Sequence, residues 1–287
     1  MSTTNELSDS EWQVVTKHDK RRVTKKKSNI RILPSSPSKA VTSSDRVADM
    51  NNTASFSASL SKVQECLIKY CEAILHSSFF DILRVSLSND DVPITQIVCY
   101  GIGNFWQPNS PPMWQLACAL ELRNYFKCHI FYFEPQMTEQ EADLLQSKEI
   151  VVIPENEQAR RLVDKPTLFF MPHCPMELYC NLMHTNWCHL DNVIIFGNSL
   201  LNYAGSIRAN VEPNDDDAGA VHLLEILQPF FVEKAITMSK DDLINMPGFF
   251  EHAFNDSYLT RFQIASDSMP QRPANTHWKT AFSGELL

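Results

Sequence analysis

Four apolar runs of the sequence each end in glycine or in polar residues of the kinds that hold ligands. Glycine lets the backbone turn sharply and lets a ligand approach the main chain closely. Carboxylate, imidazole, thiol and amide side chains supply hydrogen bonds, metal ligands or nucleophiles. The residues at these four positions are Gly101, Gly103 and Asn104; Glu134; His173 and Cys174; and Gly197, Asn198 and Ser199.

The two glycines after the first run could form part of a phosphate-binding turn. The dinucleotide fingerprint, G-x-G-x-x-G, opens directly into a helix. Here the third position is Trp106, and residues 107–111 delay the helix. Glu134 stands where an acid would bind a ribose hydroxyl, but it lies 31 residues after Gly103 rather than about 20. The pattern favours a tight connection, and a nucleotide-like or S-adenosylmethionine-like ligand is the alternative.

Histidine and cysteine are concentrated in the segment that follows the third run. A structural zinc site favours a C-x2-4-C pair, and this segment has none. The Cys174-Pro175 pair beside His173 could instead bind haem through a thiolate or an imidazole. The favoured interpretation is a strand-end turn with a hydrogen-bonded histidine, followed by a helix with buried cysteines. A catalytic cysteine or histidine is the further alternative, and a reactive thiol there would need an accessible, electropositive setting. The histidines and cysteines of this segment are His173, Cys174, Cys180, His184, Cys188 and His189.

Asn198 and Ser199 could bond a ligand, but both residue types also favour the start of a helix, and capping is the favoured interpretation. The sequence contains no G-x-S-x-G elbow, Walker A loop, H-E-x-x-H or C-x-x-C motif. It therefore offers no established catalytic signature, so we assign no catalytic residue and no metal site.

The elements that would position these residues alternate between short apolar strands and helices. Pro111 and Pro112 open one helix, where a missing N–H is tolerated, and Thr138 with Glu141 has the spacing of a capping box. This alternation predicts an α/β fold with a mostly parallel, Rossmann-like sheet and helices on both faces. The carboxyl ends of parallel strands share one edge, so the four polar groups should lie along one rim. We expect strands at 96–100, 129–133, 149–153, 167–171 and 192–196, and helices at 111–126, 138–148, 156–164 and 176–187.

The pattern is helical before this core and weaker after it. Residues 59–87 place apolar side chains on one helical face. Residues 220–236 look helical, with Pro229 as a kink or break, and residues 253–262 could add an edge strand. The predicted organisation is a disordered basic tail at 1–58, a single domain at 59–270, and a loose tail at 271–287.

Composition indicates a soluble globular protein, with 44% hydrophobic and 21% charged residues in 287. No run of about 18 apolar residues occurs, so we expect no membrane span. Eight cysteines and no secretory signal predict reduced thiols in the cytoplasm, and in the nucleus if the basic segment 17–27 directs import. A solubilising tail is the favoured interpretation of that segment.

The net charge is −9, and residues 1–40 carry nine Lys/Arg and four Asp/Glu, or +5, which leaves −14 for the remainder. An acidic body argues against wide non-specific binding of nucleic acid.

Six stretches occur in order within residues 96–203: VCYGIGNF, WQLACALEL, YFEP, EQEADLL, TLFFMPHCPMELYCNLMHTNW and VIIFGNSL. This pattern resembles the Sensitivity to Red Light Reduced family, also called the SRR-like domain. The family usually has Asp where this chain has Glu134. The positions that match the family are Gly101, Gly103, Gln115, Glu134, Pro135, Glu157, Pro172, His173, Cys174, Asn186, Trp187, Gly197, Asn198 and Ser199.

The resemblance implies a regulatory domain with no established reaction, linked to light signalling, to circadian-clock output and, in animals, to haem biosynthesis. The favoured function is therefore a non-enzymatic regulator that acts through protein partners or by sensing a small ligand, haem included. The alternative is a transferase that uses a nucleotide or S-adenosylmethionine on the strand-end rim.

Overall fold

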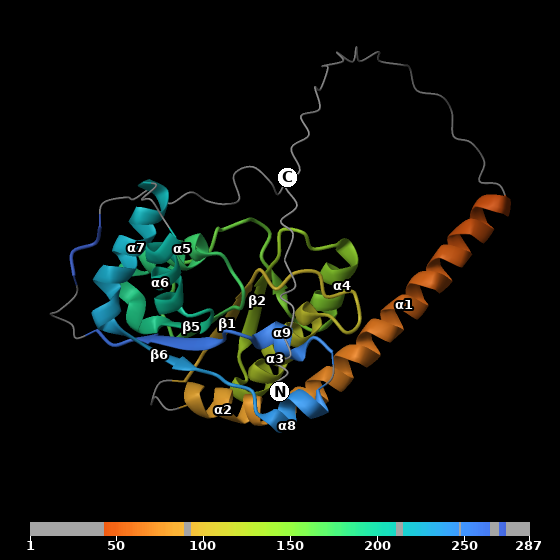
Figure 1. Cartoon of the computed structure of the whole chain (residues 1–287). Helices are drawn as coiled ribbons and strands as arrows, with labels where there is room; N and C mark the ends of the chain where they lie inside the picture. The colour runs from red at the N-terminus through yellow and green to blue at the C-terminus, as the bar shows by residue number, and fades with distance from the viewer. Residues whose placement is uncertain (1–42, 89–92, 211–214, 247, 265–269, 274–287) are drawn as a thin grey trace, which may run out of the picture. The chain divides into compact units, whose positions relative to one another are not determined.

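The computed structural model describes residues 43–88, 93–210, 215–246, 248–264 and 270–273 (Figure 1). Most of the predicted basic tail lies outside these residues, although helix α1 (Ser43–Leu75) begins before position 59, where we expected order to start. The chain divides into two compact units, Met1–Asp49 and Met50–Leu287, and every element from α2 onward belongs to the second. The domain limits at 58 and 270 stay predictions.

Seven strands of the described chain form one sheet in the order β3-β2-β1-β4-β5-β7-β6. Strands β1 to β5 are parallel, whereas β7 runs antiparallel to both β5 and β6. The predicted mostly parallel α/β sheet is therefore confirmed. The strands are β1 (Gln96–Tyr100), β2 (His129–Phe133), β3 (Val151–Val152), β4 (Thr167–Met171), β5 (Val193–Gly197), β6 (Phe231–Ala235) and β7 (Tyr258–Phe262).

Helices cover both faces of the sheet, because successive side chains of a buried strand point to opposite sides. Ile97 and Cys99 of β1 belong to a core shared with α1 to α4 and α9, whereas Val98 and Tyr100 belong to a second core shared with α5 to α7. Figure 1 shows α5, α6 and α7 gathered together. The remaining helices are α2 (Ser78–Leu87), α3 (Pro111–Phe126), α4 (Glu139–Ser147), α5 (Met176–Thr185), α6 (Leu200–Asn210), α7 (Asp215–Leu227), α8 (Lys240–Asn245) and α9 (Phe250–Phe254), with short 3-10 turns η1 (Trp187–Asn192) and η2 (Gln228–Phe230).

The predicted helix at 156–164 is wrong, since these residues form turns between β3 and β4. Gln158 and Ala159 have φ values of 49° and 56°, and two consecutive left-handed residues cannot belong to a right-handed helix. The Asn156 side chain accepts a hydrogen bond from the Gln158 backbone N–H at 2.9 Å, which favours the turn over a helical start.

Two predictions near the C-terminal end also need correction. Pro229 does break the helix predicted at 220–236, but the residues after it form strand β6 rather than more helix. Strand β7 forms within 253–262, yet it lies between β5 and β6 rather than at the edge. Its Leu259 and Thr260 are buried, whereas Val232 of β6 is 53% exposed, so burial of the side chains decides which strand lies inside.

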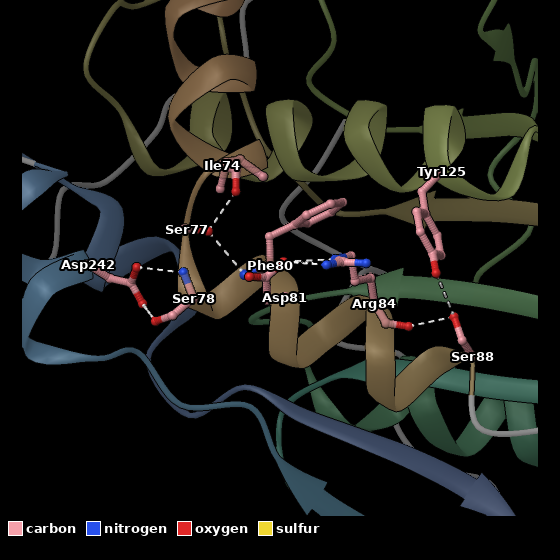
Figure 2. Close-up of polar contacts among 9 residues, drawn as sticks. All are labelled: Ile74, Ser77, Ser78, Phe80, Asp81, Arg84, Ser88, Tyr125 and Asp242. Carbon is pink, nitrogen blue, oxygen red and sulfur yellow. Dashed lines mark hydrogen bonds and ion pairs between the residues drawn. The ribbon is translucent and has the colours of Figure 1, made fainter.

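The helical face predicted over 59–87 is split into α1 and α2 at Ser77 (Figure 2). The Ser77 hydroxyl accepts a hydrogen bond from the Phe80 N–H at 3.0 Å and donates to the Ile74 carbonyl at 2.7 Å, so it ends one helix and caps the next. Asp242 of α8 binds Ser78 at the same helix start. None of the helices described is both long enough and apolar enough to span a lipid bilayer.

Candidate functional site

A cavity of about 320 Å³ lies at the carboxyl ends of β1, β2 and β4. From β1 the chain leads to β2 on one side, while β4 pairs with β1 on the other, so this is the point where the strand order reverses and where open α/β sheets bind ligands. Of the rim residues expected from the sequence, Gly101, Gly103, Glu134, His173 and Cys174 line the cavity. The other walls are Tyr100, Phe133, Pro135, Gln136, Asn156, Gln158, Ala159, Pro175 and Leu178.

The two glycines are required by the backbone and by close packing. Gly101 and Gly103 have φ values of 66° and 89°, in the left-handed region that other residues rarely adopt. A Cβ atom on Gly101 would lie 3.0 Å from the Cys174 sulfur. The glycine at this position therefore lets the ends of β1 and β4 approach each other beside the cavity.

Two carboxylates hold the loop that follows β1. Glu134 accepts a hydrogen bond from the Gly103 N–H at 2.8 Å, and Glu141 accepts from the N–H groups of Phe105 and Trp106 at 2.7 and 3.2 Å. Glu141 also completes the predicted capping box with Thr138. The sequence indicated the capping role alone, because the loop partners of Glu141 lie more than 30 positions away.

His173 is fixed by backbone and side-chain contacts on two sides. Its N–H donates to the Asn198 side-chain oxygen at 2.7 Å, which supports an uncommon φ of 58°. Its Nε2 lies 3.0 Å from the His252 carbonyl oxygen and 3.2 Å from that of Ala253. Two carbonyl acceptors require Nε2 to carry a hydrogen. This nitrogen is thus occupied and does not face an open coordination position.

Cys174 is buried, at 2% exposure, and its thiol donates to the Tyr100 carbonyl oxygen at 3.3 Å. Burial raises the pKa of this thiol well above its ordinary value, so it stays protonated at neutral pH. A buried, protonated thiol is neither a good nucleophile nor an anionic haem ligand. Within the described residues, no three His, Cys, Asp or Glu side chains come together in a way that could hold a metal ion.

Tyr100 forms a neutral wall of the cavity. Its hydroxyl donates to Glu157 Oε2 at 2.6 Å, and Arg161 binds both oxygens of the same carboxylate at 2.9 and 2.6 Å. Burial and then the bond to Glu157 raise the pKa of Tyr100. Glu157 matched the family pattern, but no spacing in the sequence indicated that it would position Tyr100.

The remaining rim residues do not line the cavity. Ser199 accepts from the Asn202 N–H at 3.0 Å, so it caps α6 as predicted. Gly197 leaves room for a tyrosine, since a Cβ there would lie 2.5 Å from the Tyr179 hydroxyl oxygen. Asn104 accepts from the Trp106 N–H at 3.1 Å and donates to Glu141 Oε2 at 3.3 Å. These residues support the rim rather than contact a ligand in the cavity.

Comparison with known proteins gives the family. The model of the SRR1 domain matches residues 60–285. The chain belongs to the SRR1 domain family. It is 30% identical over 226 residues to "Protein SENSITIVITY TO RED LIGHT REDUCED 1" of Arabidopsis thaliana, covering 74% of this chain and 81% of the plant protein. It is 33% identical over 162 residues to the SRR1-like protein of Mus musculus, covering 50% of this chain and 64% of the mouse protein.

Among solved structures, the SRR1-family fold of this chain is similar to the 23S rRNA methyltransferase ErmE. The TM-score is 0.36 at 13% identity, over 64% of this chain and 68% of that one. A likeness at this level says nothing about function.

Proposed function

We propose that this SRR1-family chain is a non-enzymatic regulatory protein that senses a small ligand with a ribose ring in the cavity between β1, β2 and β4. The observation that supports this most is the position of Glu134. It follows the second strand and contacts the glycine loop of the first, which is where nucleotide-binding α/β proteins hold a ribose.

The hydrogen-bond acceptor sites that Glu134 has left suit the two hydroxyls of a ribose diol. A carboxylate has about four acceptor sites. Here Oε2 accepts from the Gly103 N–H and Oε1 from the Gln136 N–H at 3.1 Å, which leaves an acceptor site on each oxygen for a hydroxyl. Phe133, Ala159 and Leu178 add apolar walls against which a flat base could pack.

Three described wall residues that could do chemistry are not activated, and this favours sensing over the alternative, a transferase. The Cys174 thiol is protonated and bonded to a carbonyl, and the Nε2 of His173 is occupied by two carbonyls. Tyr100 is held neutral by burial and by Glu157. None of these three is arranged as a nucleophile with its base. We therefore favour ligand binding without catalysis as the function of this cavity.

A thermal-shift series on the full chain tests the proposal. The probes are adenosine, S-adenosylmethionine, NAD, ATP and haemin, each compared with no ligand. A ligand present at about 100 times its dissociation constant stabilises the fold by about 2.7 kcal/mol. We expect a ribose-containing probe to raise the melting temperature, and Glu134→Gln to remove most of that rise.

Glu139→Gln is the matched control, because Glu139 is an exposed glutamate at the start of α4 and does not line the cavity. It should keep the ligand-induced rise. No rise with any ribose-containing probe would refute the proposal. A Soret shift with haemin that is lost in His173→Ala would support haem sensing in its place.

The regulatory output is proposed from the family. By resemblance, we propose that the chain acts on circadian-clock output and on haem biosynthesis through protein partners, in the cytoplasm and the nucleus. All eight cysteines are free thiols, which is compatible with a reducing compartment. Quantifying haem and clock-reporter rhythm in cells that carry wild type or Glu134→Gln in place of the endogenous protein tests both outputs. Unchanged haem and rhythm after complete removal of the protein would contradict them.

A further inference from the structure

The charge around the cavity limits which charge the substituents on the ribose of the proposed ligand can have. We infer that the site selects a nucleoside whose 5′ substituent is neutral or positively charged, and that it excludes phosphate-bearing nucleotides. This inference rests on the ribose site proposed above and specifies the ligand class for it.

The backbone donors of the glycine loop already have anionic partners. In a phosphate-binding loop these N–H groups point at the ligand. Here the Gly103 N–H donates to Glu134, and the N–H groups of Phe105 and Trp106 donate to Glu141. A phosphate would have to displace a carboxylate that is tied to the protein. The loop therefore presents negative charge where a phosphate cradle presents donors.

The helix that follows the loop gives little compensation. Helix α3 begins at Pro111, eight residues after Gly103, and Pro111 and Pro112 occupy its first two positions. Proline has no N–H, so two of the four donors that a helix start normally offers are missing. Ser110, which precedes the helix, makes no capping bond with its side chain. The anion-binding property of a helix N-terminus is thus weakened here by the sequence itself.

The described side chains that line the cavity add no lysine or arginine to replace these donors. Among those residues, Glu134 is the one carboxylate. Arg161 does not line the cavity, and its guanidinium binds both oxygens of Glu157 at 2.9 and 2.6 Å. A phosphate dianion beside Glu134 would meet an uncompensated like charge. Like-charge juxtaposition costs enough to weaken binding by more than about 10-fold.

The test compares each nucleoside with its own 5′-monophosphate. Isothermal titration of the full chain with adenosine, guanosine, cytidine and uridine, and with the four monophosphates, gives a ratio of dissociation constants for each pair. We expect at least one nucleoside to bind, and its monophosphate to bind more than about 10-fold more weakly. Glu134→Gln should weaken binding of the nucleoside, as proposed above, but weaken binding of its monophosphate less, because it removes the negative charge and keeps the shape of the side chain. The ratio should therefore fall. Glu139→Gln should leave the ratio unchanged.

A measurement on the unaltered chain guards against a folding defect in Glu134→Gln. Raising the salt from about 0.01 M to about 0.1 M shortens the screening length from about 30 Å to about 10 Å, so the ratio should fall. If a monophosphate binds as tightly as its nucleoside, or if the ratio of dissociation constants does not change with salt, the inference that phosphate is excluded is wrong. The proposed ribose site is not contradicted by either result. No binding by any member of either series overturns both.

Discussion

Asp242 gives the most direct test of what holds the helices in place. Its carboxylate accepts hydrogen bonds from the Ser78 N–H at 3.0 Å and the Ser78 hydroxyl at 2.5 Å (Figure 2). It also accepts from the Phe79 N–H at 3.1 Å and the Ser239 N–H at 3.0 Å. It thus caps its own helix α8 and the start of α2, which lies more than 160 positions earlier. Asp242→Asn keeps the shape of this side chain but places an amide N–H₂ against a donor.

The expected loss follows from these contacts. One buried donor left without an acceptor costs about 1–3 kcal/mol. Losing the negative charge at the first turn of α2 adds about 0.3–1 kcal/mol. Asp242→Asn should therefore lower the free energy of unfolding by about 1.3–4 kcal/mol at neutral pH, the sum of the two. Urea unfolding followed by circular dichroism measures this difference.

Asp241→Asn is the matched control, because Asp241 is exposed beside the buried Asp242. It should change stability by less than about 0.5 kcal/mol. Equal losses in Asp241→Asn and Asp242→Asn would refute the reasoning, since general charge rather than the bridging contacts would then explain them.

The pH dependence gives an independent check on Asp242. Burial opposes its ionisation, but hydrogen bonds from Ser78 and Ser239 outweigh it and hold the pKa of this carboxyl below its ordinary value of 3.8. A depressed folded-state pKa stabilises the fold above the unfolded-state pKa, and that contribution is lost as the pH falls through the folded-state value. The stability difference between wild type and Asp242→Asn should hold at neutral pH and shrink below a pH of about 4.

Three further changes test the rim. Gly101→Ala forces an alanine into φ 66° with its Cβ 3.0 Å from the Cys174 sulfur, and should cost about 1–3 kcal/mol in urea unfolding; a neutral result would contradict the tight approach of β1 and β4. Gly197→Ala should cost more than Gly101→Ala by the same assay, because its Cβ would lie 2.5 Å from the Tyr179 hydroxyl oxygen; a smaller loss would show that the tyrosine can move. The Tyr203 hydroxyl donates to the carbonyl oxygen of the rim residue Cys174 at 2.7 Å. Burial raises the pKa of Tyr203 to about 12, so its contribution to stability is complete below the unfolded pKa of about 10 and is lost as the pH rises toward 12. Stability measured across that range should fall less steeply in Tyr203→Phe, by up to about 1.4 kcal/mol per pH unit, and equal slopes would refute this.

The sequence predicted the parallel core because its strands are short apolar runs that end in glycine or polar residues. The runs that became β1, β4 and β5 are buried almost throughout, and their polar ends do meet the same edge of the sheet. Buried parallel strands are near-continuous apolar runs, so local sequence patterns are enough to predict this part of the fold.

Local sequence patterns did not predict contacts between residues that lie far apart in the chain. The turn at Gln158 and Ala159 forms where helix formers suggested a helix, since two left-handed residues override local propensity. The second role of Glu141 depends on Phe105 and Trp106, which no periodicity links to it. Likewise, β6 follows a proline within a helical pattern, and its pairing with β7 decides its conformation.

The position of β7 inside the sheet has a consequence for synthesis of the chain. β5 ends at Gly197, but the strand that completes its second side begins only at Tyr258, 61 residues later. At 5–20 residues per second, a ribosome leaves that edge without its partner for roughly 3 to 12 seconds. An open edge of a buried apolar strand is a site for wrong pairing between chains. The nascent polypeptide therefore passes through an aggregation-sensitive interval that ends when the Tyr258–Phe262 segment emerges and inserts.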